Sequence, residues 1–419
     1  MNENKYWIWL TLVFGIGSRR IWQLVNMFDS PEAIYYALKN GRSGIIFNQR
    51  EINNIKRNDI SFAEHIIKVC ELNNIGIVAY DSETYPEQLK NLSIPPAVIY
   101  YKGNIRCVLG TPTVTVVGTR NASDYSLRTT VRVCREIAEK GIVIVSGFAV
   151  GTDITAHLAA VETGRPTACV MGCGLDVDYP RANFGYRSKV IETGGVFISE
   201  YLPGTPARGS NFHRRNRILA ALGRIAVIFQ APEHSGSLIT AGLAAELGRD
   251  VFVLPPADIA DYAYKGNSML IHDGASVLLG SENITEIFEA SSPMYDRINK
   301  ESMDILMNSG EDLLEGNLTD TIDTVSEDRL MRAASYIDKH KLKYSETSAE
   351  VSAVDNEIHL NGVQRDIVEI LKDGDADTDE IALKMNMDAS EIATELTEME
   401  MTGAIKALPG KRFSIGKYK

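Results

Sequence analysis

The sequence predicts an α/β fold built on a doubly wound parallel sheet. Six nearly continuous apolar runs, of the kind that buried parallel strands require, alternate with amphipathic stretches of helical spacing. Strand, helix and strand at this spacing indicate right-handed βαβ units. The predicted strands cover residues 114–118, 142–147, 167–174, 195–200, 224–231 and 251–256. The predicted helices cover residues 124–140, 153–163, 182–193, 212–223 and 236–248.

The turns that follow these strands are rich in glycine and serine. Ligands of such sheets bind at the carboxyl ends of the strands, and free backbone N–H groups before a helix form an anion site. Gly118-Thr119-Arg120 follows the first strand, and Gly147 and Gly151 follow the second. We expect Ser123 or Asp124 to cap one helix and Asp153 to cap the next. The sequence has neither a Walker A loop nor a complete GxGxxG motif.

Three arginines gather at the start of the helix predicted at 212–223. Arg214, Arg215, Asn216 and Arg217 follow one another in a chain whose net charge is −12. Cations near a helix N-terminus oppose the macrodipole, so an anionic partner is expected. Two partners remain open. One is internal, through Glu200 and the Asp153 loop, and the other is a bound phosphate.

Length and composition indicate a globular protein of several domains. The chain has 419 residues, of which 44% are hydrophobic. Residues 1–75 look helical, 76–285 hold the sheet, 286–355 are acidic and predict a flexible linker, and 356–419 form a compact final unit. The absence of an 18-residue apolar run or a signal peptide predicts a cytoplasmic protein without a membrane span. Five cysteines without a CxxC motif predict buried, reduced thiols and no metal site.

Six motifs, in this order and spacing, resemble the DprA/Smf family. They are VVGTRNASDYS, SGFAVGTDITAH, GCGLDVDYP, SEYLPGTPARGSNFHRRNRILAALG, GSLITAGLAAELGRDVFVLPP and NSMLIHDGA. The resemblance implies an extended Rossmann-like core, a helical SAM-like or helix-hairpin-helix-like N-terminal domain and a C-terminal winged helix. It also implies a homodimer without catalytic activity or cofactor. Such a protein binds and protects incoming single-stranded DNA in natural transformation and loads the RecA recombinase.

The resemblance also assigns DNA-binding residues. The family's G-[ST]-R motif falls on Gly118, Thr119 and Arg120, which makes Arg120 the strongest candidate for a phosphate contact. Arg181 and Phe184 match a cation and a base-contacting group after Tyr179-Pro180, although Phe184 equally fits a core position. His213 replaces the proline that usually precedes the family's arginine cluster. The remaining candidates are Ser146, Gly147, Gly151, Lys189, Arg215, Asn216 and Arg217.

A phosphoribohydrolase-type enzyme is the alternative function, because small-residue turns also occur in those proteins. Such an enzyme needs a PGGxGTxxE loop, whereas this chain has APEHSGSLITAGLAAE, in which Glu246 comes too late in the sequence.

An apolar patch around residues 277–279 is a candidate surface for contact with another protein.

The two ends of the chain carry further motifs. Gly15-Ile16-Gly17, followed by Arg19 and Arg20, resembles a DNA-binding helix-hairpin-helix, and a plain packing turn explains it equally well. In the C-terminal unit the predicted third helix is acidic, with Asp388, Glu391, Glu395, Glu398 and Glu400. Only the wing is basic, through Lys406, Lys411 and Arg412. Since phosphate contacts dominate affinity for DNA, we expect a protein-contact or regulatory module here.

Overall fold

The computed structural model divides into two compact units, residues 1–309 and 310–419. It describes residues 4–41, 46–290, 362–372, 374–385, 387, 392, 395, 396, 399, 405–408 and 412–415. No helix in these ranges is long and apolar enough to cross a membrane.

The N-terminal part of the first unit is helical, as predicted. Its helices are α1 (Asn4–Phe14), α2 (Arg19–Val25), α3 (Pro31–Lys39), α4 (Gln49–Arg57) and α5 (Ile60–Leu72). The aromatic and aliphatic side chains of α1 are buried at the centre of this bundle. Trp7 and Trp22 pack on Tyr80 with ring centroids 6.1 and 4.5 Å away, which joins the bundle to the sheet.

The rest of the first unit is built on a nine-stranded sheet. Its strands are β1 (Gly76–Ala79), β2 (Val98–Gly103), β3 (Thr113–Val117), β4 (Val143–Ser146), β5 (Thr167–Met171), β6 (Val196–Ser199), β7 (Ile225–Ile228), β8 (Asp250–Val253) and β9 (Ser276–Val277). They lie in the order β1-β2-β6-β5-β4-β3-β7-β8-β9. The six predicted strands are parallel and confirmed, whereas β1 and β2 add an antiparallel edge that the periodicity did not reveal.

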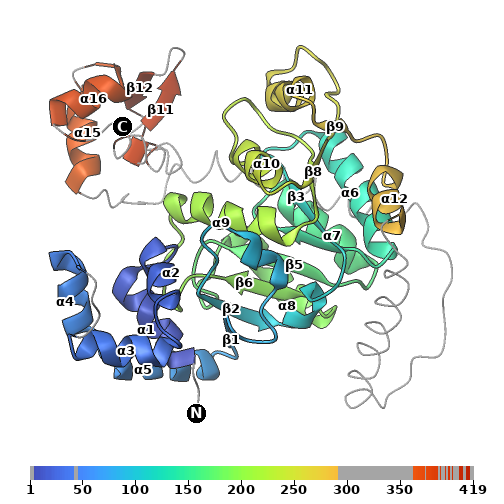
Figure 1. Ribbon diagram of the computed structural model, residues 1–419. Helices are drawn as coiled ribbons and strands as arrows, with labels where there is room; N and C mark the ends of the chain where they lie inside the picture. Colours follow the sequence, from blue (N-terminus) through green and yellow to red (C-terminus); the bar gives the residue numbers. More distant parts are fainter. Residues whose placement is uncertain are drawn as a thin grey trace. The chain divides into compact units, whose positions relative to one another are not determined.

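Helices cover both faces of the sheet (Figure 1). They are α6 (Asp124–Glu139), α7 (Thr152–Glu162), α8 (Arg187–Glu192), α9 (Gly209–Leu222), α10 (Gly236–Glu246), α11 (Lys265–His272) and α12 (Glu282–Ala290). Short 3₁₀ turns are η1 (Glu87–Asn91), η2 (Ile105–Val108), η3 (Arg181–Tyr186) and η4 (Tyr262–Tyr264). Strand side chains alternate between a core with α6 and α7 and a core with α9 and α10, which makes three layers.

Several local predictions can be compared with these elements. Ser123 caps α6 as expected, but Gly151 occupies the N-cap position of α7 that was predicted for Asp153. All five cysteines are free and buried, as predicted. The linker predicted from residue 286 begins too early, because α12 continues to Ala290 and buries Phe288 in the core. Residues 291–355 of that prediction lie outside the described residues.

The second unit has the element order of a winged helix. Helix α15 (Gly362–Lys372), β10 (Ala376–Asp377), α16 (Thr378–Met385), β11 (Ile405–Leu408) and β12 (Arg412–Ile415) surround a small apolar core. The three strands pair antiparallel in the order β10-β12-β11. Of the five acidic residues predicted for the third helix, only Glu395 is described, and it accepts a 2.9 Å hydrogen bond from Gln364. In the wing, Arg412 is paired with Glu380 at 3.3 Å.

Candidate nucleic-acid interface

Two loops pack backbone to backbone at the carboxyl ends of β3 and β4. A methyl group on Gly118 would lie 2.3 Å from Oγ1 of Thr152, and one on Gly151 would lie 2.5 Å from the carbonyl oxygen of Arg120. Gly151 also has a φ of +82°, which side chains rarely adopt. The two glycines therefore allow the Gly118–Arg120 segment to rest directly on the N-terminus of α7.

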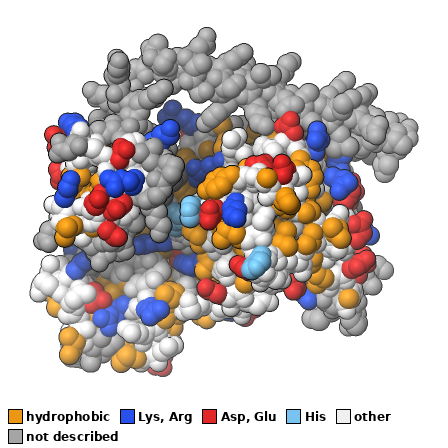
Figure 2. Space-filling view, turned by 90° about the horizontal axis from the view of Figure 1, so that it is seen from above, with side chains coloured by type: hydrophobic (Ala, Val, Ile, Leu, Met, Phe, Trp, Pro, Cys, Tyr) orange, Lys and Arg blue, Asp and Glu red, His pale blue; other side chains and the backbone are white. Residues whose placement is uncertain are grey.

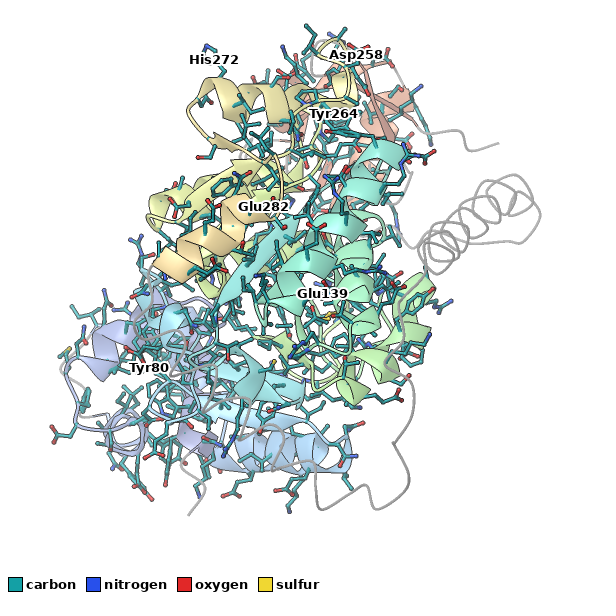
Figure 3. The ribbon with its side chains drawn as sticks, turned by 90° about the vertical axis from the view of Figure 1, so that its right-hand side faces the viewer. Tyr80, Glu139, Asp258, Tyr264, His272 and Glu282 are labelled. Carbon is teal, nitrogen blue, oxygen red and sulfur yellow. The ribbon has the colours of Figure 1, made fainter. Side chains whose placement is uncertain are left out.

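Arg120 extends from this braced loop into solvent. The amide of Thr119 donates a 2.7 Å hydrogen bond to the carbonyl oxygen of Gln230, whose side-chain Oε1 accepts from the amide of Ser123 at 2.8 Å. The hydroxyl groups of Ser123 and Tyr264 lie 2.6 Å apart, and Figure 3 labels Tyr264 above this region. The Arg120 side chain is exposed and has no ion pair among the residues described. The hydrogen bonds therefore fix the loop, and the Arg120 guanidinium remains accessible to an anionic ligand.

Arg215 lies beneath this surface and is 5% exposed. Its Nη1 donates to the carbonyl oxygens of Gly147, at 3.1 Å, and Val170. The Asp153 carboxylate accepts from the amides of Gly147 and Ala149 at 3.2 and 3.4 Å. Burial raises the pKa of Asp153, and the charge of Arg215 opposes that rise. Of the two roles left open for this arginine, the structure places it in the internal one, and its predicted direct contact with DNA does not fit this burial.

Arg217 and Asn216 are also engaged within the protein. Nη2 of Arg217 lies 2.5 Å from Oε2 of Glu200, the internal partner that the sequence offered. Asn216 is 8% exposed and donates to the carbonyl oxygen of Gly236 at 3.3 Å. Helix α9 begins at Gly209, so the arginines lie in its second and third turns, beyond the strongest part of the macrodipole. In this cluster Arg214 alone is exposed and without an ion pair to a described residue.

The loop after β5 presents an aromatic ring beside a cation. Phe184 is 45% exposed, so its alternative role as a core residue is wrong. The Arg187 guanidinium lies over the rings of Phe184 and Phe197, 5.6 and 5.3 Å from their centroids. The Arg187 guanidinium also donates to the carbonyl oxygens of Leu175 and Val177 at 3.1 and 3.0 Å. These hydrogen bonds fix its position beneath the Phe184 ring. Arg181, in the same 3₁₀ turn, is exposed.

A buried amide ties this loop to the one after β4. The side chain of Asn183 donates a 2.9 Å hydrogen bond to the carbonyl oxygen of Phe148, which itself adopts a φ of +58°. Because β3, β4 and β5 are consecutive in the sheet, the loops that bear Arg120 and Arg181 share one edge. Lys189 is further along, on α8, with its Nζ 5.8 Å from the ring centroid of Tyr186.

Two of the predicted contact residues have structural roles instead. Ser146 is fully buried, and its hydroxyl donates to the carbonyl oxygen of Val116 at 2.6 Å. The amide of Gly147 is already taken by Asp153. The motifs did not identify Arg187 as a candidate. The only feature of the sequence that points to it is its position three residues after the aromatic side chain of Phe184. Nor did the motifs identify the exposed Arg208, which occupies the N-cap position of α9.

No three potential metal ligands converge among the described residues. A cavity of about 500 Å³ between α6 and α12 is lined mainly by acids, namely Glu136, Glu139, Glu282, Glu286 and Glu289. Figure 3 labels Glu139 and Glu282 there. Carboxylates repel phosphate, so an anionic ligand is favoured at the strand ends and disfavoured at this cavity.

Comparisons with known proteins agree with this architecture. Residues 76–289 match the family model for DNA recombination-mediator protein A, and residues 351–411 match the DprA winged helix domain. The Smf protein of Synechocystis sp. is 33% identical over 302 residues, which span 71% of this chain and 75% of that protein. DNA processing protein DprA of Streptococcus pneumoniae is 39% identical over 207 residues, 49% of this chain and 72% of that protein.

A solved structure shows the same fold. The X-ray structure of DNA processing protein A from Streptococcus pneumoniae superposes with a TM-score of 0.53 and 32% identity, covering 59% of this chain and 86% of that one. The matched sheet region carries the loops that hold Arg120, Arg181 and Phe184. The resemblance expected from the motifs is confirmed, and the chain belongs to the DNA recombination-mediator protein A (DprA/Smf) family.

Proposed function

We propose that the carboxyl edge of the sheet binds the backbone of single-stranded DNA. The observation that carries this proposal is Arg120, a solvent-exposed cation on a loop fixed by Gln230 and by the close approach of Gly151. A rigid loop loses little entropy when its side chain engages a phosphate. Arginine also offers two parallel N–H donors to phosphate oxygens. Arg181, in the 3₁₀ turn that follows β5, supplies a second exposed cation, and β4 lies between β5 and the strand that precedes Arg120.

Phe184 supports an unpaired strand as the ligand. Its half-exposed ring rests on the Arg187 guanidinium and can stack on a base, which adds about 1–3 kcal/mol without sequence preference. In a duplex the faces of the bases are covered by their neighbours. The combination of phosphate cations with a stacking ring therefore favours single-stranded over double-stranded DNA.

The same proposal includes protection of incoming DNA, RecA loading, a homodimer and action in the cytoplasm. Five unpaired thiols are in keeping with a reducing compartment. Protein contacts need exposed apolar surface, and Figure 2 shows hydrophobic side chains gathered on the face seen from above. Exposed apolar side chains occur on α10, on α11 and after β9. They include Ile239, Met269 and Leu279, which are 42%, 39% and 76% exposed.

We propose a role without catalysis at this edge. An enzyme of the alternative class would need the glutamate of its PGGxGTxxE loop three residues after the position of Gly236-Ser237, in the early part of α10, where this chain has Thr240. Glu246 is the last residue of α10, ten residues beyond Gly236, and thus about 15 Å along the helix from that loop. This placement gives no support to the phosphoribohydrolase alternative.

The test of the DNA site is a titration of fluorescent oligo-dT with wild-type protein and Arg120→Ala at several salt concentrations. We expect at least about a tenfold loss of affinity, and a salt slope reduced by about 0.7 for one lost phosphate contact. Arg106→Ala is the matched control, because Arg106 is an exposed arginine in η2, before β3 and therefore at the opposite edge of the sheet. Equal affinities for wild type and Arg120→Ala would refute the proposed site.

RecA loading needs its own assay. We expect the full-length protein to accelerate RecA filament assembly on oligo-dT, followed by ATP hydrolysis, and Leu279→Asp to reduce that acceleration while oligo-dT affinity stays unchanged. Absence of any acceleration by the wild type would refute the loading role and leave the binding role standing.

A further inference from the structure

The N-terminal hairpin Gly15-Ile16-Gly17 lies against α9. A methyl group on Gly17 would be 3.8 Å from Nη2 of Arg217, and Figure 1 shows α2 beside α9. Gly15 and Gly17 have φ values of +84° and +68°, and both are exposed. A turn more than 190 residues away in the chain thus borders the arginine cluster of the sheet edge.

Three exposed arginines belong to the two segments that make this contact. Arg19 follows the hairpin by two residues, and Arg214 lies one helical turn before Arg217 on the same face of α9. Arg208 immediately precedes α9. None of the three forms an ion pair or side-chain hydrogen bond with the residues that the structure describes.

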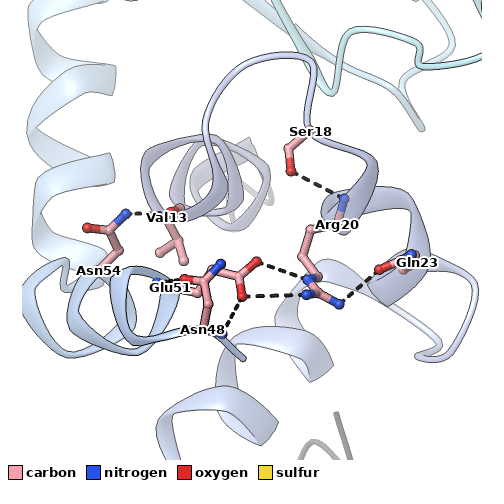
Figure 4. A network of polar contacts seen from close by, with 7 residues as sticks. All are labelled: Val13, Ser18, Arg20, Gln23, Asn48, Glu51 and Asn54. Carbon is pink, nitrogen blue, oxygen red and sulfur yellow. Dashed lines mark hydrogen bonds and ion pairs between the residues drawn. The ribbon is translucent and has the colours of Figure 1, made fainter. Parts of the chain in front are cut away.

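The neighbouring arginines differ in this respect. Arg20 donates to Glu51 at 3.0 Å and to Gln23 at 3.0 Å, in the network drawn in Figure 4. Glu51 in turn closes the capping box of α4 with Asn48. Arg217 is neutralised by Glu200. Arg20 and Arg217 therefore maintain the fold, and the earlier expectation that Arg20 holds DNA does not fit its contacts.

Acidic side chains are missing from the segments that form this surface. Residues 14–28 contain no aspartate or glutamate, and neither do residues 201–223, which run through the loop after β6 and α9. In a chain of net charge −12, all formal charges of these two segments are therefore positive, and each such charge acts over about one Debye length, 8 Å in cells.

We propose that single-stranded DNA bound at the sheet edge continues across the start of α9 onto the N-terminal hairpin. Arg214 and Arg208 hold the phosphates next to the edge, and Arg19 holds one or more beyond them. This inference rests on the proposed function of the sheet edge. It adds a second contact region, supplied by the helical domain, which only a strand longer than the first site can reach.

A length series tests this extension. Wild-type protein and Arg19→Ala are titrated with oligo-dT of about 6 and about 20 nucleotides, of which the first lies near the lower end of the usual range of about 4–16 nucleotides for a single-strand site and the second exceeds it. We expect Arg19→Ala to bind the long oligonucleotide about fivefold more weakly and the short one as tightly as wild type does. Arg19→Lys should recover most of the loss, because it restores the charge.

Arg57→Ala is the control within the same domain, since Arg57 is an exposed arginine at the end of α4. It should match wild type at both lengths. Unchanged affinity of Arg19→Ala for the long oligonucleotide would overturn the inference, and so would an equal loss at both lengths. Arg120→Ala, run in parallel, separates the two proposals: a loss at both lengths supports the sheet-edge site, whatever the result for Arg19.

Discussion

Glu200 and Arg217 form an ion pair, 2.5 Å between Oε2 and Nη2, in which the carboxylate side chain is only 4% exposed. Burial raises the pKa of Glu200, and the charge of Arg217 opposes this rise. The pair joins the end of β6 to α9 beside the N-terminal hairpin. It therefore connects the sheet, the long crossover helix and the helical domain at one point.

Breaking this pair from one side should destabilise the protein strongly. Arg217→Ala leaves a buried carboxylate without its partner, which costs about 3 kcal/mol in the free energy of unfolding. The double variant with Glu200→Ala should lose less than the sum of the two single variants. Urea denaturation of all four proteins measures the coupling, and strict additivity would mean that the pair contributes no interaction energy.

Gly151 should be intolerant of a side chain. Gly151→Ala places a methyl group 2.5 Å from the carbonyl oxygen of Arg120 at a φ of +82°, so we expect a loss of stability of about 2 kcal/mol and weaker binding of oligo-dT. Gly164 is the matched control, because its φ is +70° but no atom lies within 4 Å of the added methyl group. Gly164→Ala should carry the backbone cost alone and bind oligo-dT normally. Similar effects of the two substitutions on binding would exclude a role of the Gly151 contact in placing Arg120.

Phe184 should contribute to binding without altering its salt dependence. Phe184→Ala removes one stacking surface, which weakens oligo-dT binding by about 1–3 kcal/mol. The slope of affinity against salt should stay that of wild type, since no phosphate contact is lost. Phe62→Ala, which removes a ring that is 53% exposed on α5, provides the comparison. A changed salt slope in Phe184→Ala would indicate that the ring acts by positioning Arg181 or Arg187.

Asp153 should make stability depend on pH in a defined direction. Its pKa is raised above the ordinary value of 3.8, chiefly by burial. The folded state then binds a proton more tightly than the unfolded state, so this contribution is present at low pH and is lost as pH rises through the raised value. The free energy of unfolding of wild type, relative to Asp153→Asn, should fall as pH increases above 3.8. Denaturation at several pH values measures this difference, and a constant or rising difference would contradict the assignment.

Local pattern and connectivity were enough to predict the six parallel strands, the helices between them and the edge at which we propose that DNA binds. Buried parallel strands need continuous apolar runs, and their carboxyl ends must meet at one edge, so these features follow from local pattern and connectivity. The motifs also identified the family and the candidates Arg120, Arg181 and Phe184. Strands β1 and β2 are no shorter than the predicted strands, but only the 3₁₀ turn η1 separates them, so they lack the strand–helix–strand spacing on which the prediction rested.

Which of the clustered arginines are available to a ligand depends on tertiary packing and could not be predicted from the sequence. Arg214, Arg215 and Arg217 are near neighbours in sequence, yet one is exposed, one donates to buried carbonyl oxygens and one is paired with Glu200. Their partners lie between 17 and 68 residues away along the chain, at positions that the crossover of α9 over the sheet brings together. The sequence gives the charge of each side chain. Whether that charge is paired or buried within the protein depends on contacts that form only when distant segments pack together.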